Sequence, residues 1–111
     1  DIYQEIQAAS QYYSELPFSF LLKGDDPLLP KKEKKDVYVS GVIDLIYKQK
    51  DGWTIVDFKT DHVKKEEDIA KLTRHYAPQL TFYKAAFERM TKETVEKMKL
   101  YFVTANKIIE L

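Results

Sequence analysis

Two neighbouring runs of residues decide the fold of this chain: Val37-Tyr-Val-Ser-Gly-Val-Ile-Asp-Leu-Ile-Tyr-Lys48 and Trp53-Thr-Ile-Val-Asp-Phe-Lys-Thr60. Both are rich in the β-branched and aromatic residues that favour strands. The polar link between them, Gln49-Lys-Asp-Gly52, contains an Asp-Gly pair, which is typical of a tight turn. We therefore predict a β-hairpin with strands at Asp36–Lys48 and Trp53–Thr60. Because both faces of each strand carry apolar residues, we expect the hairpin at the centre of a sheet.

On the N-terminal side of the hairpin we expect a helix, a strand and a loop. Asp1–Tyr13 has apolar residues at helical spacing, which predicts a helix. Pro17–Leu22 is an apolar run that begins at a proline, and the start of a strand tolerates the missing N–H. Lys23–Lys35 combines glycine and prolines with the charged run Lys31–Lys35, so we expect a solvated connection there.

On the C-terminal side we expect a helix and then a strand. Glu66–Thr91 has helical periodicity, with a break near Pro78, a residue suited to a first helical turn. Lys99–Ala105 predicts the strand, and a strand reached through a helix usually pairs parallel to its neighbour with a right-handed crossover. The predicted fold class is therefore α/β: a helix, a three-strand meander, a helix and a strand, forming a small mixed sheet flanked by helices. Two apolar stripes on the second helix indicate that both of its sides are covered: Leu80, Tyr83 and Phe87, and Phe82, Ala86 and Met90.

Composition excludes several classes of protein. The 111 residues fit one domain, which we place at 1–111, and they start at Asp1, so we expect a fragment of a longer chain. Eighteen Lys and Arg balance 18 Asp and Glu, so any attraction to nucleic acid must be local. The absence of cysteine excludes disulfides, iron–sulfur clusters and a cysteine nucleophile, and is compatible with the cytoplasm. No apolar run approaches the ~18 residues of a membrane span.

Three charged residues stand out in the hairpin: Asp44, Asp57 and Lys59. Aspartate is depleted in strands, and a buried unpaired carboxylate is costly. Asp57 and Lys59 share a face because side chains alternate. A four-residue loop at Gln49–Gly52 places Asp44 opposite Asp57, a two-residue loop at Asp51-Gly52 places it opposite Lys59, and an odd loop sends it to the other face. Either even register also places an apolar set together on the opposite face: Ile43, Leu45, Val56 and Phe58.

The cluster suits phosphodiester hydrolysis. Two adjacent carboxylates repel each other unless a cation intervenes, and Mg²⁺ prefers one or two carboxylates together with carbonyl, water and phosphate oxygens. A nearby lysine can stabilise the charge that develops on a phosphate. On these residues alone, an Asp–Lys cross-strand pair on a partly wet sheet face is an equally good interpretation.

Four ordered motifs resemble those of RecB-family nucleases in the PD-(D/E)XK superfamily, over nearly the whole chain: Glu15-Leu-Pro-Phe18, Gly41-Val-Ile-Asp44, Asp57-Phe-Lys-Thr-Asp61 and Gln79-Leu-Thr-Phe-Tyr83. The resemblance implies a restriction-endonuclease-like core. It also implies that Mg²⁺, or Mn²⁺, is held by Asp44, Asp57 and the backbone carbonyl of Phe58. The catalytic residues implied are Asp44, Asp57, Lys59, Gln79 and Tyr83, with Glu15, Tyr76 and Asp61 at the rim of the site.

The same resemblance implies a function. It is that of a Mg²⁺-dependent, exonuclease-type deoxyribonuclease within an ATP-dependent helicase–nuclease that processes double-strand DNA ends for recombinational repair. The implied partners are DNA, a helicase part of the same chain and a second subunit, with no membrane and no iron–sulfur cluster. The family usually has an upstream histidine ligand, but no histidine precedes His62, so the site can be incomplete in this chain. We expect His62 and His75 to be solvated. The alternative function is a catalytically inactive DNA-binding or scaffold module with the nuclease fold.

Overall fold

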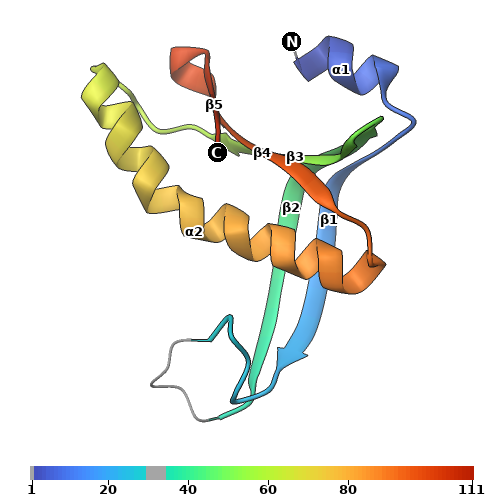
Figure 1. Ribbon diagram of the computed structural model, residues 1–111. Coiled ribbons are helices and arrows are strands. Elements are labelled where there is room, and N and C mark those ends of the chain that lie inside the picture. The colour runs from blue at the N-terminus through green and yellow to red at the C-terminus, as the bar shows by residue number, and fades with distance from the viewer. Residues whose placement is uncertain (1, 30–34) are drawn as a thin grey trace.

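A computed structural model describes residues 2–29 and 35–111. A five-stranded mixed sheet in the order β1-β2-β3-β4-β5 lies between the long helix α2 and the short helix α1 (Figure 1). The predicted α/β class is confirmed. The helices and strands are α1 (Ile2–Ala8), β1 (Gln11–Leu22), β2 (Val37–Gln49), β3 (Gly52–Lys59), α2 (Glu66–Thr91), β4 (Val95–Phe102), the 3₁₀ turn η1 (Val103–Ala105) and β5 (Lys107–Glu110).

The central hairpin is formed by β2 and β3, as predicted. The two antiparallel strands are joined by Lys50 and Asp51 alone, because Gln49 already pairs with Gly52. This link is shorter than the predicted Gln49–Gly52 loop, but it preserves the same register. Gly52 has a φ of 134°, which a residue with a side chain rarely adopts.

We expect Gly52→Ala to lower the free energy of unfolding by about 1–3 kcal/mol, because the new methyl group is strained at this φ. It would also lie 2.6 Å from Cγ of Glu96 and 3.2 Å from the main-chain oxygen of Thr94. Urea unfolding followed by the fluorescence of Trp53, the single tryptophan, measures the change. Lys50→Ala in the same turn is the control and should stay within about 0.5 kcal/mol of wild type. Equal stability of the two variants would contradict the strain argument.

The N-terminal helix ends earlier than predicted. It stops at Ala8, and β1 begins at Gln11, so the expected helix through Tyr13 is wrong for its last residues. Pairing explains the difference: Gln11 to Ser14 pair with β2, and the ring of Tyr13 stacks on that of Trp53 at 6.0 Å. Tertiary pairing has therefore overridden the helical pattern of the local sequence.

Helix α2 runs without interruption through Pro78, so the predicted break there is wrong. A proline inside a helix leaves the carbonyl four residues earlier without its donor. Pro78 and Arg74 are not buried, so water can bond to that carbonyl. Leu80, Ala86 and Phe87 are buried, as the apolar stripes predicted. The last turn of α2 is not covered by the rest of the protein, since Met90 is 42% exposed.

Strand β4 follows α2 and pairs parallel to β3, which confirms the predicted parallel pairing. It spans Val95–Phe102 rather than Lys99–Ala105, and the buried Val95 anchors its start. Residues 103–105 form η1, which turns through the left-handed Asn106 into β5, a strand that we did not predict. Charged residues between Val95 and Leu100 concealed the start of β4 in the sequence.

Buried residues form two clusters, one on each face of the sheet. The larger one lies against α2 and includes Ile46, Ile55, Leu80, Phe87 and Leu100. The smaller one lies against α1 and consists of Ile2, Leu45, Tyr47 and Val56. The hydroxyl of buried Tyr47 donates a hydrogen bond to Oε2 of Glu5 at 3.1 Å, which ties α1 to the sheet.

The alternation of side chains is interrupted at matching positions of β1 and β2. Ile43 and Ile46 both belong to the cluster against α2, whereas Leu45 belongs to the opposite cluster. The β1–β2 pairing skips Glu15, which has a left-handed φ of 52° and lies across from Asp44. The backbone around Asp44 therefore leaves the regular ladder.

The interruption corrects one expectation. The four residues that we expected on one apolar face do not share it, because Ile43 packs on the other side. Phe58 does lie on the α1 side, where its ring is 5.8 Å from that of Tyr101, but it is 40% exposed. Phe58, which lies between Asp57 and Lys59 on β3, is therefore only partly protected from water.

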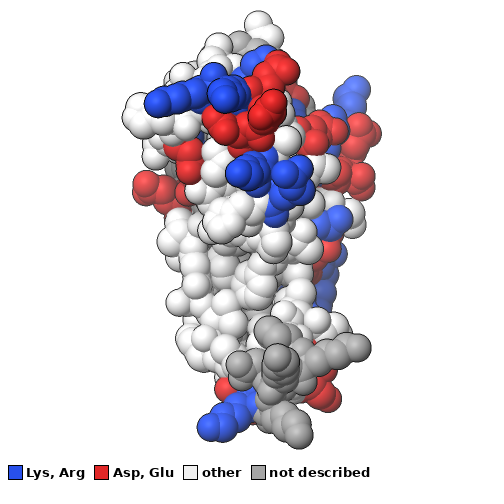
Figure 2. Space-filling view, turned by 90° about the vertical axis from the view of Figure 1, so that its left-hand side faces the viewer, with Lys and Arg blue, Asp and Glu red and all other residues white. Residues whose placement is uncertain are grey.

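The loop after β1 is fixed at its start. Arg89 near the end of α2 donates two hydrogen bonds to the carboxylate of Asp26, at 2.8 and 2.9 Å. Of the run predicted to be solvated, Lys35 is exposed, and residues 31–34 lie outside the described residues. No helix in the described part of the chain is long and apolar enough to cross a membrane. Acidic and basic side chains are mixed at the top of the face shown in Figure 2, and the middle of this face is largely uncharged.

Candidate active site

The hairpin register places Asp44 across from Asp57. The last regular pair is Leu45 with Val56, and one step further along both strands leads to these two aspartates. Oδ2 of Asp44 accepts a hydrogen bond from the backbone N–H of Phe58 at 3.0 Å. Of the two even registers considered, the structure has the one that brings the carboxylates together.

Asp57 is a buried carboxylate, only 3% exposed, at the end of β3. Burial, together with a hydrogen bond to the Asp44 carboxyl, raises its pKa to about 6, while Lys59 acts in the opposite direction. The ammonium Nζ of Lys59 lies 2.7 Å from Oδ2 of Asp57. Among the described residues, the ammonium of Lys59 is the cation paired with this buried oxygen.

Two residues of α2 complete the surroundings of Lys59. Its Nζ donates a hydrogen bond to Oε1 of Gln79 at 2.8 Å and lies 4.0 Å from the ring centroid of Tyr76. Tyr83 follows Gln79 by one turn on the same helix. Burial, followed by the charges of Asp57 and Asp44, raises the pKa of Tyr83. The structure thus brings all five predicted catalytic residues together from β2, β3 and α2.

The three residues predicted at the rim lie on two sides of the acidic pair. Glu15 is exposed and lines an open pocket with Ser14, Asp44 and Phe58. Tyr76 and Asp61 lie on the α2 side, where the Tyr76 hydroxyl donates to both carboxylate oxygens of Asp61, at 3.2 and 3.1 Å. This hydrogen bond is the first cause, and burial the second, of a raised Tyr76 pKa.

One residue that supports the site, Thr104, was not predicted from the sequence. The hydroxyl of Thr104, in η1, donates to the main-chain oxygen of Asp61 at 2.7 Å and holds the segment after β3. Nothing in the local pattern around Thr104 signals this contact, which depends on the parallel pairing of β3 with β4. His62 is exposed, as expected, and His75 packs its ring against Tyr76 with the centroids 4.9 Å apart.

The donor set fits a divalent cation held partly by the protein and partly by water or phosphate. Within residues 2–29 and 35–111, no group of three or more His, Cys, Asp or Glu side chains could hold a metal. Two adjacent carboxylates do occur, at Asp44 and Asp57, and the buried Oδ2 of Asp57 faces the ammonium of Lys59. Mg²⁺ is commonly bound through one or two carboxylates and keeps several waters, so these residues suit it.

We expect the stability of the metal-free chain to fall as pH rises from about 4 to 6. The pKa of Asp57 is raised from 3.8 to about 6 in the folded state, so in this window the folded chain holds more protons than the unfolded chain. The difference corresponds to about 3 kcal/mol at most. Urea unfolding between pH 4 and 7 in EDTA measures the slope, and Asp57→Asn, which has no proton to lose, is the control. Parallel pH curves for the two chains would contradict the raised pKa.

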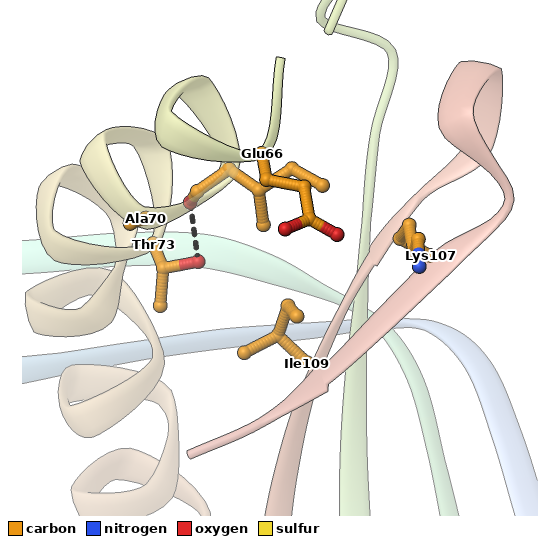
Figure 3. A pocket seen from close by; sticks show the side chains of 6 residues that line it. Glu66, Ala70, Thr73, Lys107 and Ile109 are labelled. Atoms are coloured by element: carbon orange, nitrogen blue, oxygen red, sulfur yellow. Dashed lines mark hydrogen bonds between the residues drawn. The ribbon is translucent and has the colours of Figure 1, made fainter.

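A separate pocket lies between the start of α2 and β5 (Figure 3). Glu66 and Lys107 stand on opposite sides of it, and the apolar residues that line it are Ile69, Ala70 and Ile109. The hydroxyl of Thr73 is already used, because it donates to the main-chain oxygen of Ile69 at 2.7 Å. None of the predicted catalytic residues lines this pocket, so it is not part of the acidic site.

A sheet flanked by helices, with paired carboxylates and a lysine on its central hairpin, defines a nuclease-like class of protein. A family model described as PD-(D/E)XK nuclease superfamily matches residues 2–110, and the chain belongs to this superfamily. The resemblance found in the sequence motifs is therefore confirmed.

Similar proteins are named as subunits of an ATP-dependent helicase/nuclease. The chain is 31% identical to the one from Oceanobacillus iheyensis over 116 residues, which cover 100% of this chain and 9% of that protein. It is 34% identical over 110 residues to the one from Carboxydothermus hydrogenoformans, covering 97% and 9%, and 32% identical over 119 residues to the one from Bacillus mycoides, covering 100% and 10%. The chain thus spans about a tenth of the length of the curated relatives it matches.

Proposed function

We propose that this chain is the metal-dependent nuclease part of a DNA-processing enzyme and that it hydrolyses phosphodiester bonds. The observation that carries the proposal is the contact of buried Asp57 with Asp44 and with the ammonium of Lys59, 2.7 Å away. A structural Asp–Lys pair would not need a second carboxylate against it, because the second carboxylate raises the energy of the charged state. Such an arrangement is suited to a site that binds a cation.

The ligands of the ion would be Asp44, Asp57 and the backbone carbonyl of Phe58, with Mg²⁺ or Mn²⁺ as the ion. When bound, it would supply positive charge next to the scissile phosphate and make a bound water more acidic. Asp57 must be deprotonated to act as a ligand. Because its pKa is about 6, most of it is deprotonated at neutral pH. Lys59 would stabilise the charge that builds on the phosphate, and Gln79 and Tyr83 would hold that lysine and close the site on the α2 side.

The names of the relatives extend the proposal to the whole protein. They are called ATP-dependent helicase/nuclease subunits, so we place this chain in such an enzyme. We further propose that its nuclease activity is of the exonuclease type. Its role would be to process double-strand DNA ends for recombinational repair in the cytoplasm. The partners would be DNA, the helicase part of the same chain and an AddB-like second subunit. The chain itself has no cysteine with which to bind an iron–sulfur cluster.

One observation favours a second function, that of an inactive nuclease-fold module that binds DNA or serves as a scaffold. The described residues offer two carboxylates but no histidine ligand and no third acidic partner for a metal. A site with so few protein ligands could have lost its chemistry while the fold remained.

Cleavage by the full-length helicase–nuclease distinguishes the two functions. End-labelled linear DNA is incubated with the protein in MgCl₂, in MnCl₂ and in EDTA, and the products are resolved on a denaturing gel. We expect short products with either metal and none with EDTA. DNA binding without cleavage in both metals would support the scaffold function and overturn the nuclease.

A further inference from the structure

The ammonium group of Lys59 is enclosed by three different groups. Oδ2 of Asp57 lies 2.7 Å away, Oε1 of Gln79 accepts a hydrogen bond at 2.8 Å, and the ring centroid of Tyr76 is 4.0 Å away. The lysine side chain is only 15% exposed. The Tyr76 ring therefore occupies a side of the ammonium where water would otherwise lie.

An aromatic ring is suited to this position for a chemical reason. An ammonium within about 6 Å of a ring centroid is attracted by the negative face of the ring. The ring has no strong acceptor of its own on that face, so it confines the ammonium without competing with a substrate oxygen for its N–H groups. Lysine has a flexible four-carbon stem, and such confinement reduces the positions that its charged end can take.

The ring is itself held at its far end. The Tyr76 hydroxyl donates to both carboxylate oxygens of Asp61, at 3.2 and 3.1 Å, and the main-chain oxygen of Asp61 accepts from Thr104 at 2.7 Å. Asp61 follows Lys59 by two residues along the chain. The ring on α2 is thus tied to the segment that carries the lysine, and that segment is tied to η1.

We propose that Tyr76 is a positioning residue that fixes the Lys59 ammonium beside Asp57 through the face of its ring, with Asp61 holding the ring. This inference rests on the proposed nuclease function. Misplacing a catalytic group by about 1 Å can slow a reaction about 100-fold, so loss of the ring should be visible in the rate of the chemical step.

The test compares variants of the full-length helicase–nuclease in the DNA cleavage assay with MgCl₂. Tyr76→Leu removes the ring and should lower kcat about 10- to 100-fold, with the KM for DNA and the Kd for Mn²⁺, measured by electron paramagnetic resonance, unchanged. Tyr76→Phe keeps the ring and loses only the anchor to Asp61, so it should retain most of the activity. This split between kcat and KM, and the recovery with phenylalanine, would not follow from a general loss of stability.

Two controls show whether Tyr76 acts through Lys59. In a Lys59→Ala background, Tyr76→Leu should cause no further loss, because residues that act as a unit are not additive. Phe82→Leu is the matched control, an equal change on the same helix at a ring that packs against Phe18 and Phe20, and it should leave kcat unchanged.

The outcomes separate this inference from the proposed function. Wild-type activity of Tyr76→Leu, or equal losses in the wild-type and Lys59→Ala backgrounds, would overturn the role of Tyr76 while leaving the nuclease function intact. Lack of metal-dependent cleavage by the wild-type protein, or full activity of Lys59→Ala, would instead remove the proposed function itself.

Discussion

Asp57→Asn in the full-length helicase–nuclease should lower DNA cleavage at least about 1,000-fold, because removal of one member of a catalytic unit disables the whole unit. The amide keeps the size of the side chain but lacks the negative charge that would bind the ion. Asp57 is buried against Asp44 and Lys59, and the described residues include no third carboxylate in this group that could replace it. ATP-driven unwinding should stay near normal, because the change is confined to the end of β3. Gel assays of product formation and strand separation on the same substrate measure both activities.

The matched control for this variant is Asp51→Asn in the turn of the same hairpin. Asp51 is exposed and lies at the opposite end of β3 from Asp57, so its substitution should leave cleavage unchanged. Retained cleavage in Asp57→Asn would remove Asp57 from the site. Loss of cleavage in both variants would show that the hairpin, rather than the carboxylate, had been disturbed.

Lys59→Ala should slow cleavage about 100- to 1,000-fold while the affinity for the metal stays close to that of wild type, because a lysine can stabilise charge on the phosphate but is not a metal ligand. Removing the ammonium also takes away the group that lowers the pKa of Asp57. The Kd for Mn²⁺ should therefore be measured at pH 8, where Asp57 is deprotonated in both proteins. At this pH a change in kcat reports the role of Lys59 in the chemical step, and a change in the Kd for Mn²⁺ reports the metal ligands.

Lys48→Ala is the control for this change. Lys48 lies in the same hairpin but pairs with Glu93 at 2.9 Å and has no contact with the acidic pair in the described structure. Its replacement should leave both kcat and the Kd for Mn²⁺ unchanged. A collapse of Mn²⁺ binding in Lys59→Ala at pH 8 would show that the lysine organises the ligands rather than the chemical step.

The hairpin and its acidic pair could be predicted because they depend on local sequence. β-branched residues on both sides of a short polar link define β2 and β3, and the period of two places Asp57 and Lys59 on one face. Of the two even registers, the one that the structure has places Asp44 opposite Asp57, with Lys50 and Asp51 as the link. The motif Gln79 to Tyr83 could be placed on one side of a helix for the same reason, since its spacing is one helical turn.

Contacts between distant segments could not be predicted from the sequence. Helix α1 ends at Ala8 because β1 extends to pair with β2. Helix α2 continues through Pro78 because the carbonyl of Arg74, which has lost its donor, can bond to water. Ile43 changes faces where β1 and β2 leave their ladder at Glu15 and Asp44. Periodicity within one segment carries no information about these pairings, since it describes only the faces of that segment.

Local patterns in the sequence were thus sufficient to predict the class of fold, the central hairpin and a cluster of Asp57 and Lys59 on one face, whereas the register that brings Asp44 to Asp57 was left open. The contacts that hold the lysine come from distant segments and could not be predicted: Gln79 and Tyr76 lie on α2, and Asp61 and Thr104 hold the Tyr76 ring and the segment after β3. The difference lies in how far apart along the chain the interacting residues are. Strand pairing across a short turn is fixed by neighbours along the chain, whereas the packing of α2 on the sheet depends on burying apolar side chains from every element at once.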